Sequence, residues 1–291
     1  MNRPAEGPPP IASHRHPVAV RLRKLSRRPV LARREGVFLL DGVHLLEEAL
    51  SSPHVPETIL IAPRLDATAP GQALRAAMTG RGWPLLRVTD ELLESVAPTT
   101  TPQGVLGLFR RPSMPGLPQP VAHAPGAAAL ILAGLQDPAN LGAIARAARV
   151  FACPLLITLA GTVDPYHPRA TRASSGSLLH LTIVPDAPEP DLRSWVEQWR
   201  VRAVALVPRD GRAIPARAPG DPPLALVLGS EGAGIPPAVE ALCSERWSIP
   251  MAEGAESLGV AAAGAIALYA ARAEEARDPR SRGIVDSISS A

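Results

Sequence analysis

Three stretches of the sequence place polar and charged residues beside glycines, each directly after an apolar run. They read LQDPANLGAIARAARVF with Asn140 and Arg146, LVLGSEGAGI with Glu231, and SIPMAEGAESLGVAAAGAIALY with Ser257. Glycine lets a ligand approach the backbone closely, and Arg, Glu and Asn side chains can hold charge at a reacting group. These stretches are therefore the candidates for a site that binds a ligand and carries chemistry.

Arg146 is predicted to point away from the protein core. Asp137 suits a helix N-cap and Pro138 suits the first helical position, so a helix begins directly after the apolar run. Arg146 lies two residues beyond Ile144, whose side chain belongs to the apolar stripe of that helix. The alternative is an ordinary solvated arginine, and Glu231 could likewise serve only as a helix cap.

The third stretch predicts a helix of small residues that Ser257 caps. Its expected apolar face consists of Leu258, Ala261, Ala262, Ala265 and Leu268. Side chains this small allow close packing against another element or a second subunit, although a plain buried helix fits the pattern too. A glycine within such a helix costs up to about 1 kcal/mol relative to alanine.

Several kinds of site lack their sequence signatures. A P-loop needs a GK[ST] ending, a dinucleotide site needs GxGxxG and a serine hydrolase needs GxSxG, and the chain has none of the three. No HExxH occurs, and Cys153 and Cys243 stand far apart, so we expect no metal site and buried, unreactive thiols.

The elements that position these stretches alternate between strands and helices. Runs such as AAALILAGL, PLLITLA, VRAVALVP and PLALVLGS are almost wholly apolar, which predicts a mostly parallel sheet covered by helices on both faces. Ligands of such sheets lie beyond the carboxyl ends of the strands. The loops that follow these runs are therefore where a site is expected.

The predicted organisation has two α/β domains. We expect a disordered tail over 1–17, a small α/β domain over 18–110, a Pro-rich linker over 111–126, the larger sheet domain over 127–275 and a tail over 276–291. The first domain opens with a basic helix over 18–36.

Charge and hydropathy narrow the class of protein. Residues 1–36 hold nine basic and two acidic residues, which suits a polyanion, although base composition explains the arginine bias equally well. No apolar run reaches the ~20 residues of a membrane span, and the N-terminus lacks a signal-peptide core. A soluble, cytoplasmic protein is expected.

Taken in order, NLGAIARAA, LVLGSEGAGI and IPMAEGAESLGVAAAGAIALY resemble the three motifs of the SpoU (TrmH-like) RNA ribose 2′-O-methyltransferases. PRATRASSGSLLHLTIV is similar to the segment between the first two motifs. KLSRRPVLARREGVFLLDGVHLLEEAL resembles the small substrate-binding domain of that family. The resemblance covers about residues 18–272.

The resemblance implies a deep trefoil knot at the C-terminal end of the sheet domain, a homodimer formed through that domain, and S-adenosylmethionine as the cofactor. It implies RNA as the substrate, ribosomal RNA more than transfer RNA because of the N-terminal domain. Cofactor contacts are expected at Val207, Pro208, Gly229, Ile249 and Leu258.

For the reaction itself, the resemblance gives the decisive role to Arg146, either as base or as stabiliser of the forming alkoxide. We favour the stabiliser, because a guanidinium gives up its proton reluctantly. Asn140, Glu231 and Ser257 complete the catalytic set. Arg172 and the basic residues of the N-terminal helix are expected to bind RNA; these are Arg23, Lys24, Arg27 and Arg28.

Gly259 departs from the family pattern, which has Asn in SLNV where this chain reads SLGV, and Ala147 replaces a common Thr. This departure leaves a second reading open: a catalytically weakened RNA-binding dimer of the same fold. A small-molecule hydrolase or nucleotide-binding enzyme is a third reading, which lacks its motifs.

Overall fold

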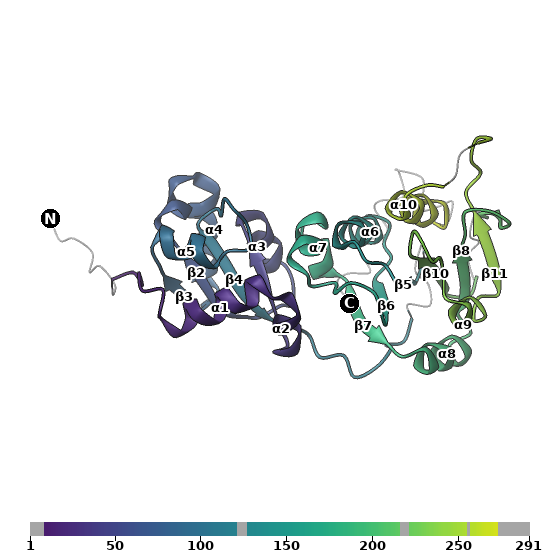
Figure 1. Cartoon of the computed structure of the whole chain (residues 1–291), viewed down its shortest axis with the longest axis horizontal. Helices are drawn as coiled ribbons and strands as arrows, with labels where there is room; N and C mark the ends of the chain where they lie inside the picture. The colour runs from purple at the N-terminus through teal and green to yellow at the C-terminus, as the bar shows by residue number, and fades with distance from the viewer. Residues whose placement is uncertain (1–8, 121–126, 216–220, 255–256, 273–291) are drawn as a thin grey trace. The chain divides into compact units, whose positions relative to one another are not determined.

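The computed structural model describes residues 9–120, 127–215, 221–254 and 257–272. The chain divides into two compact units, one of Met1–Ser113 with Tyr166–Leu179 and the other of Met114–Pro165 with His180–Ala291. Figure 1 colours the chain from purple at the N-terminus to yellow at the C-terminus. The tail predicted over 276–291 lies outside the described residues.

The first unit is built around a four-stranded sheet of order β1-β4-β2-β3. The pairs β1-β4 and β4-β2 are antiparallel and β2-β3 is parallel. Its elements are α1 (Pro17–Arg27), α2 (Pro29–Arg34), β1 (Val37–Asp41), α3 (Val43–Leu50), β2 (Pro56–Ile61), η1 (Pro63–Ala67), α4 (Ala69–Gly80), β3 (Leu85–Arg87), α5 (Asp90–Val96), β4 (Val105–Arg110) and α7 (Pro168–Ala173). The apolar runs VFLLDG, TILIAP, PLLRVT and GVLGLFRR, each of which predicts a strand, form β1, β2, β3 and β4.

The basic N-terminal segment forms two helices, so the single helix predicted over 18–36 is wrong. Arg28 has φ −135° and ψ 81°, which ends α1 and precedes Pro29, the first residue of α2. A residue before proline is disfavoured in the helical region because the proline ring clashes with it. Pro29 therefore breaks the helix while leaving its basic residues close together in sequence.

The tail predicted to be disordered over 1–17 is also too long. Ile11 forms a parallel bridge with Val88, in which its N–H donates to the carbonyl of Arg87 at 2.9 Å and its own carbonyl accepts from Thr89 at 3.0 Å. The side chain of Ile11 packs against the core of the first unit. Residues 1–8 lie outside the described residues.

The second unit confirms the predicted α/β class with a parallel sheet. Its seven strands have the order β7-β6-β5-β10-β8-β11-β9, and each of the six neighbouring pairs is parallel. The elements are β5 (Ala129–Ala133), α6 (Pro138–Val150), β6 (Leu155–Leu159), β7 (Thr182–Ala187), α8 (Glu189–Gln198), β8 (Arg202–Leu206), β9 (Arg212–Ala213), β10 (Leu224–Gly229), α9 (Pro237–Glu240), β11 (Glu245–Ser248) and α10 (Val260–Ala270). The short helix η2 (Ser177–His180) crosses the boundary between the units, since Leu179 belongs to the first and His180 to the second. Of the seven strands described, only the two-residue β9 was not predicted, since LTIVPD and RWSIPM also read as strands and form β7 and β11.

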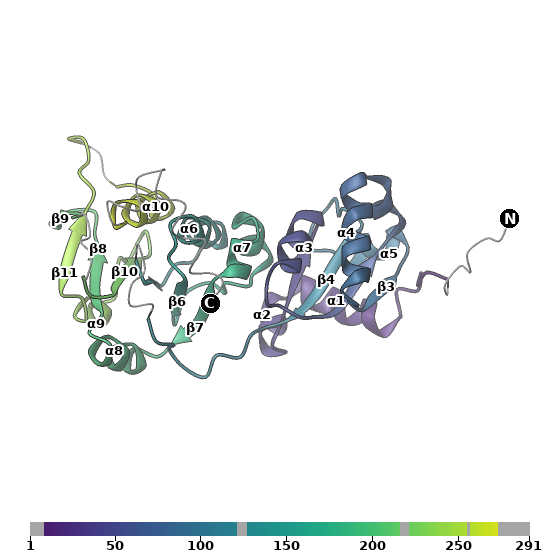
Figure 2. The same ribbon diagram turned by 180° about the vertical axis from the view of Figure 1, so that it is seen from behind.

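Helices cover both faces of this sheet, as Figures 1 and 2 show with α6 and α10 on one side and α8 on the other. Every residue of β5 and β6 is buried, which explains their uninterrupted apolar sequences. Trp195 of α8 packs with Ile131 in one cluster.

Within the described residues, no helix is long and apolar enough to cross a membrane.

The buried face of α10 differs from the predicted one. Leu268 is buried as expected, but Leu258 and Ala262 are exposed, and the helix instead buries Val260, Gly264 and Ala267. A Cβ at Gly264 would lie 3.0 Å from Leu228 Cδ2, so the missing side chain lets α10 approach β10 closely. Because α10 lacks a polar side, its periodicity could not identify the face that packs inward.

Part of the predicted linker belongs to the second unit. Met114 and Leu117 pack against the core beside α8, and Trp195 Nε1 donates a hydrogen bond of 2.7 Å to the carbonyl of Pro118. Residues 121–126 lie outside the described part of the chain. The implied knot stays a prediction, since residues 255–256, between β11 and α10, are not described either.

Candidate functional site

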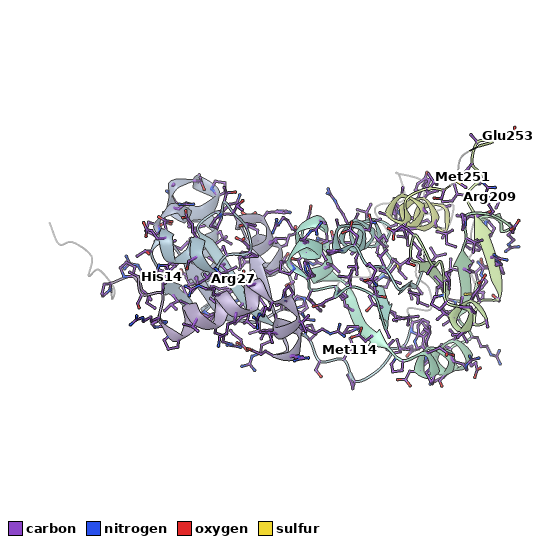
Figure 3. The ribbon with its side chains drawn as sticks, viewed as in Figure 1. His14, Arg27, Met114, Arg209, Met251 and Glu253 are labelled. Carbon is purple, nitrogen blue, oxygen red and sulfur yellow. The ribbon has the colours of Figure 1, made fainter. Side chains whose placement is uncertain are left out.

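A cavity of about 470 Å³ opens at the carboxyl ends of the central strands of the second unit. Parallel strands end at the same edge of a sheet, so loops that are distant in sequence meet there. The lining residues lie within the segments 206–210, 228–235, 249–251 and 257–263, with Glu240 and Arg246 beside them. Figure 3 labels two of them, Arg209 and Met251.

All five residues predicted to contact the cofactor line this one cavity. They come from three loops: Val207 and Pro208 follow β8, Gly229 ends β10, and Ile249 and Leu258 lie between β11 and α10. Among the lining residues, Leu258 is 38% exposed although it is apolar, which leaves its side chain accessible to a ligand. The structure thus gathers the predicted cofactor residues, and their role remains a prediction.

The turn after β10 requires glycine at Gly229. Ser230 and Gly234 exchange two backbone hydrogen bonds of 3.1 and 3.0 Å, which folds residues 230–234 back over the strand end. A Cβ on Gly229 would lie 2.1 Å from the carbonyl carbon of Gly234 and 2.4 Å from the nitrogen of Ile235. The tight packing of this turn therefore shapes one wall of the cavity.

Asn140 and Glu231 meet across two loops. The Asn140 side-chain nitrogen donates to Glu231 Oε1 at 2.5 Å, and Glu231 lines the cavity. Asn140 stands in the first turn of α6, which Asp137 caps by accepting from the N–H of Ala139 at 2.9 Å. The predicted N-cap is confirmed, and it fixes the start of the helix that presents Asn140.

Arg146 lies exposed on α6, while Ile144 and Ala145 beside it are buried. The prediction that Arg146 points away from the core is thereby confirmed. Among the described residues, the lining of the cavity includes Glu231 and Ser257 but not Asn140 or Arg146. Arg172 is exposed on α7, which belongs to the first unit.

Gly259, not Ser257, is the N-cap of α10. The helix begins at Val260, and Gly259 has φ −56° and ψ 142°, a conformation that any residue can adopt. No side chain caps this helix, and an added Cβ at Gly259 would find no heavy atom within 4 Å. The predicted cap at Ser257 and the helix-interior cost at Gly259 are therefore both wrong, because the helix starts later than expected.

Replacing Gly259 by Asn is expected to leave the fold intact and to raise the free energy of unfolding by a few tenths of a kcal/mol. Asn is a better N-cap than Gly because its side chain accepts from the first-turn N–H groups. Thermal unfolding measures the effect. The matched control is Gly264→Asn on the same helix, which should lower Tm clearly because a side chain there meets Leu228. A clear loss of stability in Gly259→Asn would contradict the open space at this position.

The basic residues of the N-terminal helices divide into two groups. The Arg23 guanidinium contacts Ser95 Oγ at 3.1 Å and His14 Nδ1 at 3.2 Å, so part of its donor capacity is used within the unit. Lys24, Arg27 and Arg28 are exposed, and Figure 3 labels Arg27. The second group is therefore better placed than Arg23 to contact a polyanion.

Two further kinds of site, metal-ligating clusters and reactive thiols, depend on His, Cys, Asp and Glu side chains. In the described part of the chain, no group of three or more of these side chains could hold a metal ion. Burial raises the pKa of the Cys153 and Cys243 thiols to about 12, so both stay protonated near neutral pH. Cys153 is fully buried, whereas Cys243 is only partly buried.

The cavity lining also includes residues for which the sequence predicted no role, among them Arg209, Asp210, Glu240, Arg246 and Met251. Arg209 and Asp210 directly follow the predicted strand VRAVALVP. Because ligands of parallel sheets lie beyond the carboxyl ends of the strands, both residues could have been predicted to line the site. The side chains of Glu240 and Arg246 come from a helix end and from within a strand. No local sequence signal marks such positions as part of a site.

Two family descriptions match the chain. Residues 127–269 match the SpoU rRNA Methylase family, and residues 20–107 match the MRM3-like substrate binding domain. An uncharacterized tRNA/rRNA methyltransferase of Mycobacterium bovis is 30% identical over 251 residues, which cover 85% of each chain. The 23S rRNA (guanosine(2553)-2′-O)-methyltransferase RlmP of Bacillus subtilis is 29% identical over 80% of this chain and 88% of its own.

A solved structure shares the fold over both units. The SpoU methyltransferase AviRb of Streptomyces viridochromogenes, in complex with the cofactor AdoMet, aligns with a TM-score of 0.77 over 88% of this chain and 97% of its own. At 24% identity, this likeness shows the fold alone. Together with the relatives of similar length, the matches confirm the resemblance seen in the three motifs: the chain belongs to the SpoU rRNA methylase family of RNA methyltransferases.

Proposed function

We propose that this chain transfers the methyl group of S-adenosylmethionine to a ribose 2′-hydroxyl of structured RNA, ribosomal RNA more than transfer RNA. The observation that carries the proposal is the cavity itself. Val207, Gly229 and Leu258 come from separate motifs and line one space, and Asn140 contacts Glu231 on its wall. The RlmP relative is named for this reaction on 23S rRNA.

The cavity fits the proposed cofactor by size and by lining. Its volume of about 470 Å³ falls within the range of roughly 300–1,000 Å³ typical of small-molecule sites. Ile249, Leu258 and Val260 offer apolar contacts for an adenine ring, and the turn at 229–234 offers backbone groups. When bound, S-adenosylmethionine supplies an electrophilic methyl group on a sulfonium.

The chain's own residues would have to orient a ribose hydroxyl and stabilise the oxyanion that forms as its proton leaves. Arg146 is assigned to the neighbouring phosphate and the developing alkoxide, since its exposed position lets RNA reach it. Asn140 holds the Glu231 carboxylate in place through the 2.5 Å hydrogen bond. Ser257 stands on the cavity wall, where its hydroxyl can contact the bound groups.

RNA binding is assigned to the exposed basic residues of the first unit and to Arg172. Changing Lys24, Arg27 and Arg28 together to glutamine is expected to weaken RNA binding at low salt and to flatten its salt dependence, because each lost phosphate contact lowers the slope of log K against log salt by about 0.7–0.9. Binding titrations at several salt concentrations measure both quantities. The triple variant of Arg64, Arg75 and Arg193, which form ion pairs with acidic side chains, serves as control. An unchanged slope in the first variant would contradict this RNA surface.

A homodimer is proposed through the outer face of α6 and α10. Val150 is 61% exposed, Ile266 41% and Tyr269 53%, although all three are large and apolar. The centroids of the Tyr269 and Phe151 rings lie 5.7 Å apart, and Phe151 is the C-cap of α6, so this contact joins the ends of the two helices into one surface. A second copy of the chain would bury it. Sedimentation equilibrium that found only monomer at micromolar concentration would oppose this proposal.

The second candidate function, an RNA-binding dimer with weakened activity, rests on Gly259. Incubating the protein with labelled S-adenosylmethionine and total bacterial RNA, followed by mapping of methylated riboses, tests the leading function. Incorporation by the wild-type chain supports it. RNA binding without incorporation, under conditions in which Gly259→Asn is active, would favour the second. The cytoplasm remains the expected location for either.

A further inference from the structure

The cavity wall carries one ion pair that the reaction outlined above does not use. Arg246 Nε lies 3.2 Å from Glu240 Oε1, and both residues line the cavity. Their side chains are 51% and 34% exposed, so the pair can be reached by a ligand while its two charges stay together.

Two separate elements hold this pair. Glu240 is the last residue of α9, which follows the glycine-rich turn after β10. Arg246 lies in β11 opposite Ala205 of the neighbouring parallel strand β8. The pair thus joins the wall formed by the turn to the wall formed by the strands, and it presents a cation and an anion side by side.

Fold stability gives little reason for such a pair. Exposed ion pairs contribute about 0–1 kcal/mol to the free energy of unfolding. The pair between Glu189 and Arg193 on α8, at 2.7 Å, is exposed to a similar degree but lies outside the described cavity lining. Glu240 and Arg246 differ from that pair by their place in the cavity and not by their chemistry.

We propose that Glu240 and Arg246 bind the amino-acid end of the cofactor, an inference that rests on the proposed function. Arg246 donates to the α-carboxylate, for which its planar fork suits two parallel hydrogen bonds. Glu240 accepts from the α-ammonium. The neutral ribose and adenine groups have no such pair of opposite charges, and Ile249 and Leu258 offer apolar contacts to them elsewhere in the cavity.

Calorimetric titration with two ligands tests the assignment. S-adenosylhomocysteine retains the amino-acid end, and 5′-methylthioadenosine has the same adenine, ribose and thioether without it. Glu240→Gln and Arg246→Gln are expected to weaken S-adenosylhomocysteine binding about tenfold, as the loss of a charged hydrogen bond predicts. Binding of 5′-methylthioadenosine should stay unchanged in both variants.

Two controls accompany these variants. Glu189→Gln tests the loss of an exposed ion pair outside the cavity and should bind both ligands as the wild type does. Asp210→Asn tests another acidic residue of the cavity lining. Equal Tm values for Glu240→Gln and the wild type exclude misfolding as the cause of weaker binding.

The outcomes separate this inference from the function on which it rests. If both ligands weaken equally in Glu240→Gln, the pair contacts the nucleoside and the proposal is overturned. It is overturned as well if neither ligand weakens, or if only Asp210→Asn loses S-adenosylhomocysteine. A wild-type chain that binds neither ligand would instead overturn the proposed cofactor, and this assignment with it.

Discussion

Replacing Arg146 by lysine is expected to lower kcat/KM for methyl transfer by about 100-fold or more, a loss typical of removing one group that stabilises a developing oxyanion. Lysine keeps the positive charge but cannot reproduce the two-pronged hydrogen bonding of a guanidinium. Single-turnover transfer from labelled S-adenosylmethionine to RNA measures the effect.

The position of Arg146 makes the expected loss specific to the transfer step. Because Arg146 is not among the described residues of the cavity lining, S-adenosylhomocysteine should bind the variant as tightly as the wild type. Arg149→Lys is the matched control, since Arg149 is exposed on the same helix one turn further on. Near-full activity of Arg146→Lys would exclude both roles considered for this residue, base and stabiliser.

A single methyl group at Gly229 is expected to be almost as damaging by a different route. A Cβ there would lie 2.1 Å from the carbonyl carbon of Gly234 and 2.2 Å from its oxygen, and both are backbone atoms that cannot rotate away. Gly229→Ala should therefore cost about 1–3 kcal/mol, as overpacking does, and displace the turn that shapes the cavity. Thermal unfolding and S-adenosylhomocysteine titration should both register the change.

Gly259→Ala is the control for that experiment, because it adds the same methyl group to another glycine of the cavity lining where no heavy atom lies within 4 Å. It should retain ligand binding. If both alanine variants behave alike, the packing of the turn against Gly229 does not govern the cavity.

Local pattern was enough to predict most strands. A strand such as β5 is buried on both faces of a parallel sheet, so its consecutive residues are all apolar and the strand can be recognised from sequence. Helix starts were predictable where a cap was unambiguous, as at Asp137. The start of α10 was not predicted: Ser257 has the better capping side chain, yet the helix begins at Val260 with Gly259 at the N-cap position.

The candidate site residues also include some that the sequence placed correctly and some that only the structure could place. The pairing of Asn140 with Glu231 joins residues that are 91 positions apart, and the motif order suggested that they belong to one site. The partners of Arg23 are a different case. His14 and Ser95 take up part of its donor capacity, although the sequence placed Arg23 with Lys24, Arg27 and Arg28 among the residues predicted to bind RNA, on the basis of charge.

By itself, the sequence determined the α/β class, the parallel sheet and the three ordered motifs, because each depends on residues that are neighbours in the chain. The tertiary structure decided which side chains share the cavity, which face of α10 is buried, and that Gly259 caps this helix with open space around it. These depend on how distant elements pack. The residues of α10 are small and uniformly apolar, so their periodicity does not show which face is buried. No local sequence pattern predicts that Glu240 and Arg246 form an ion pair.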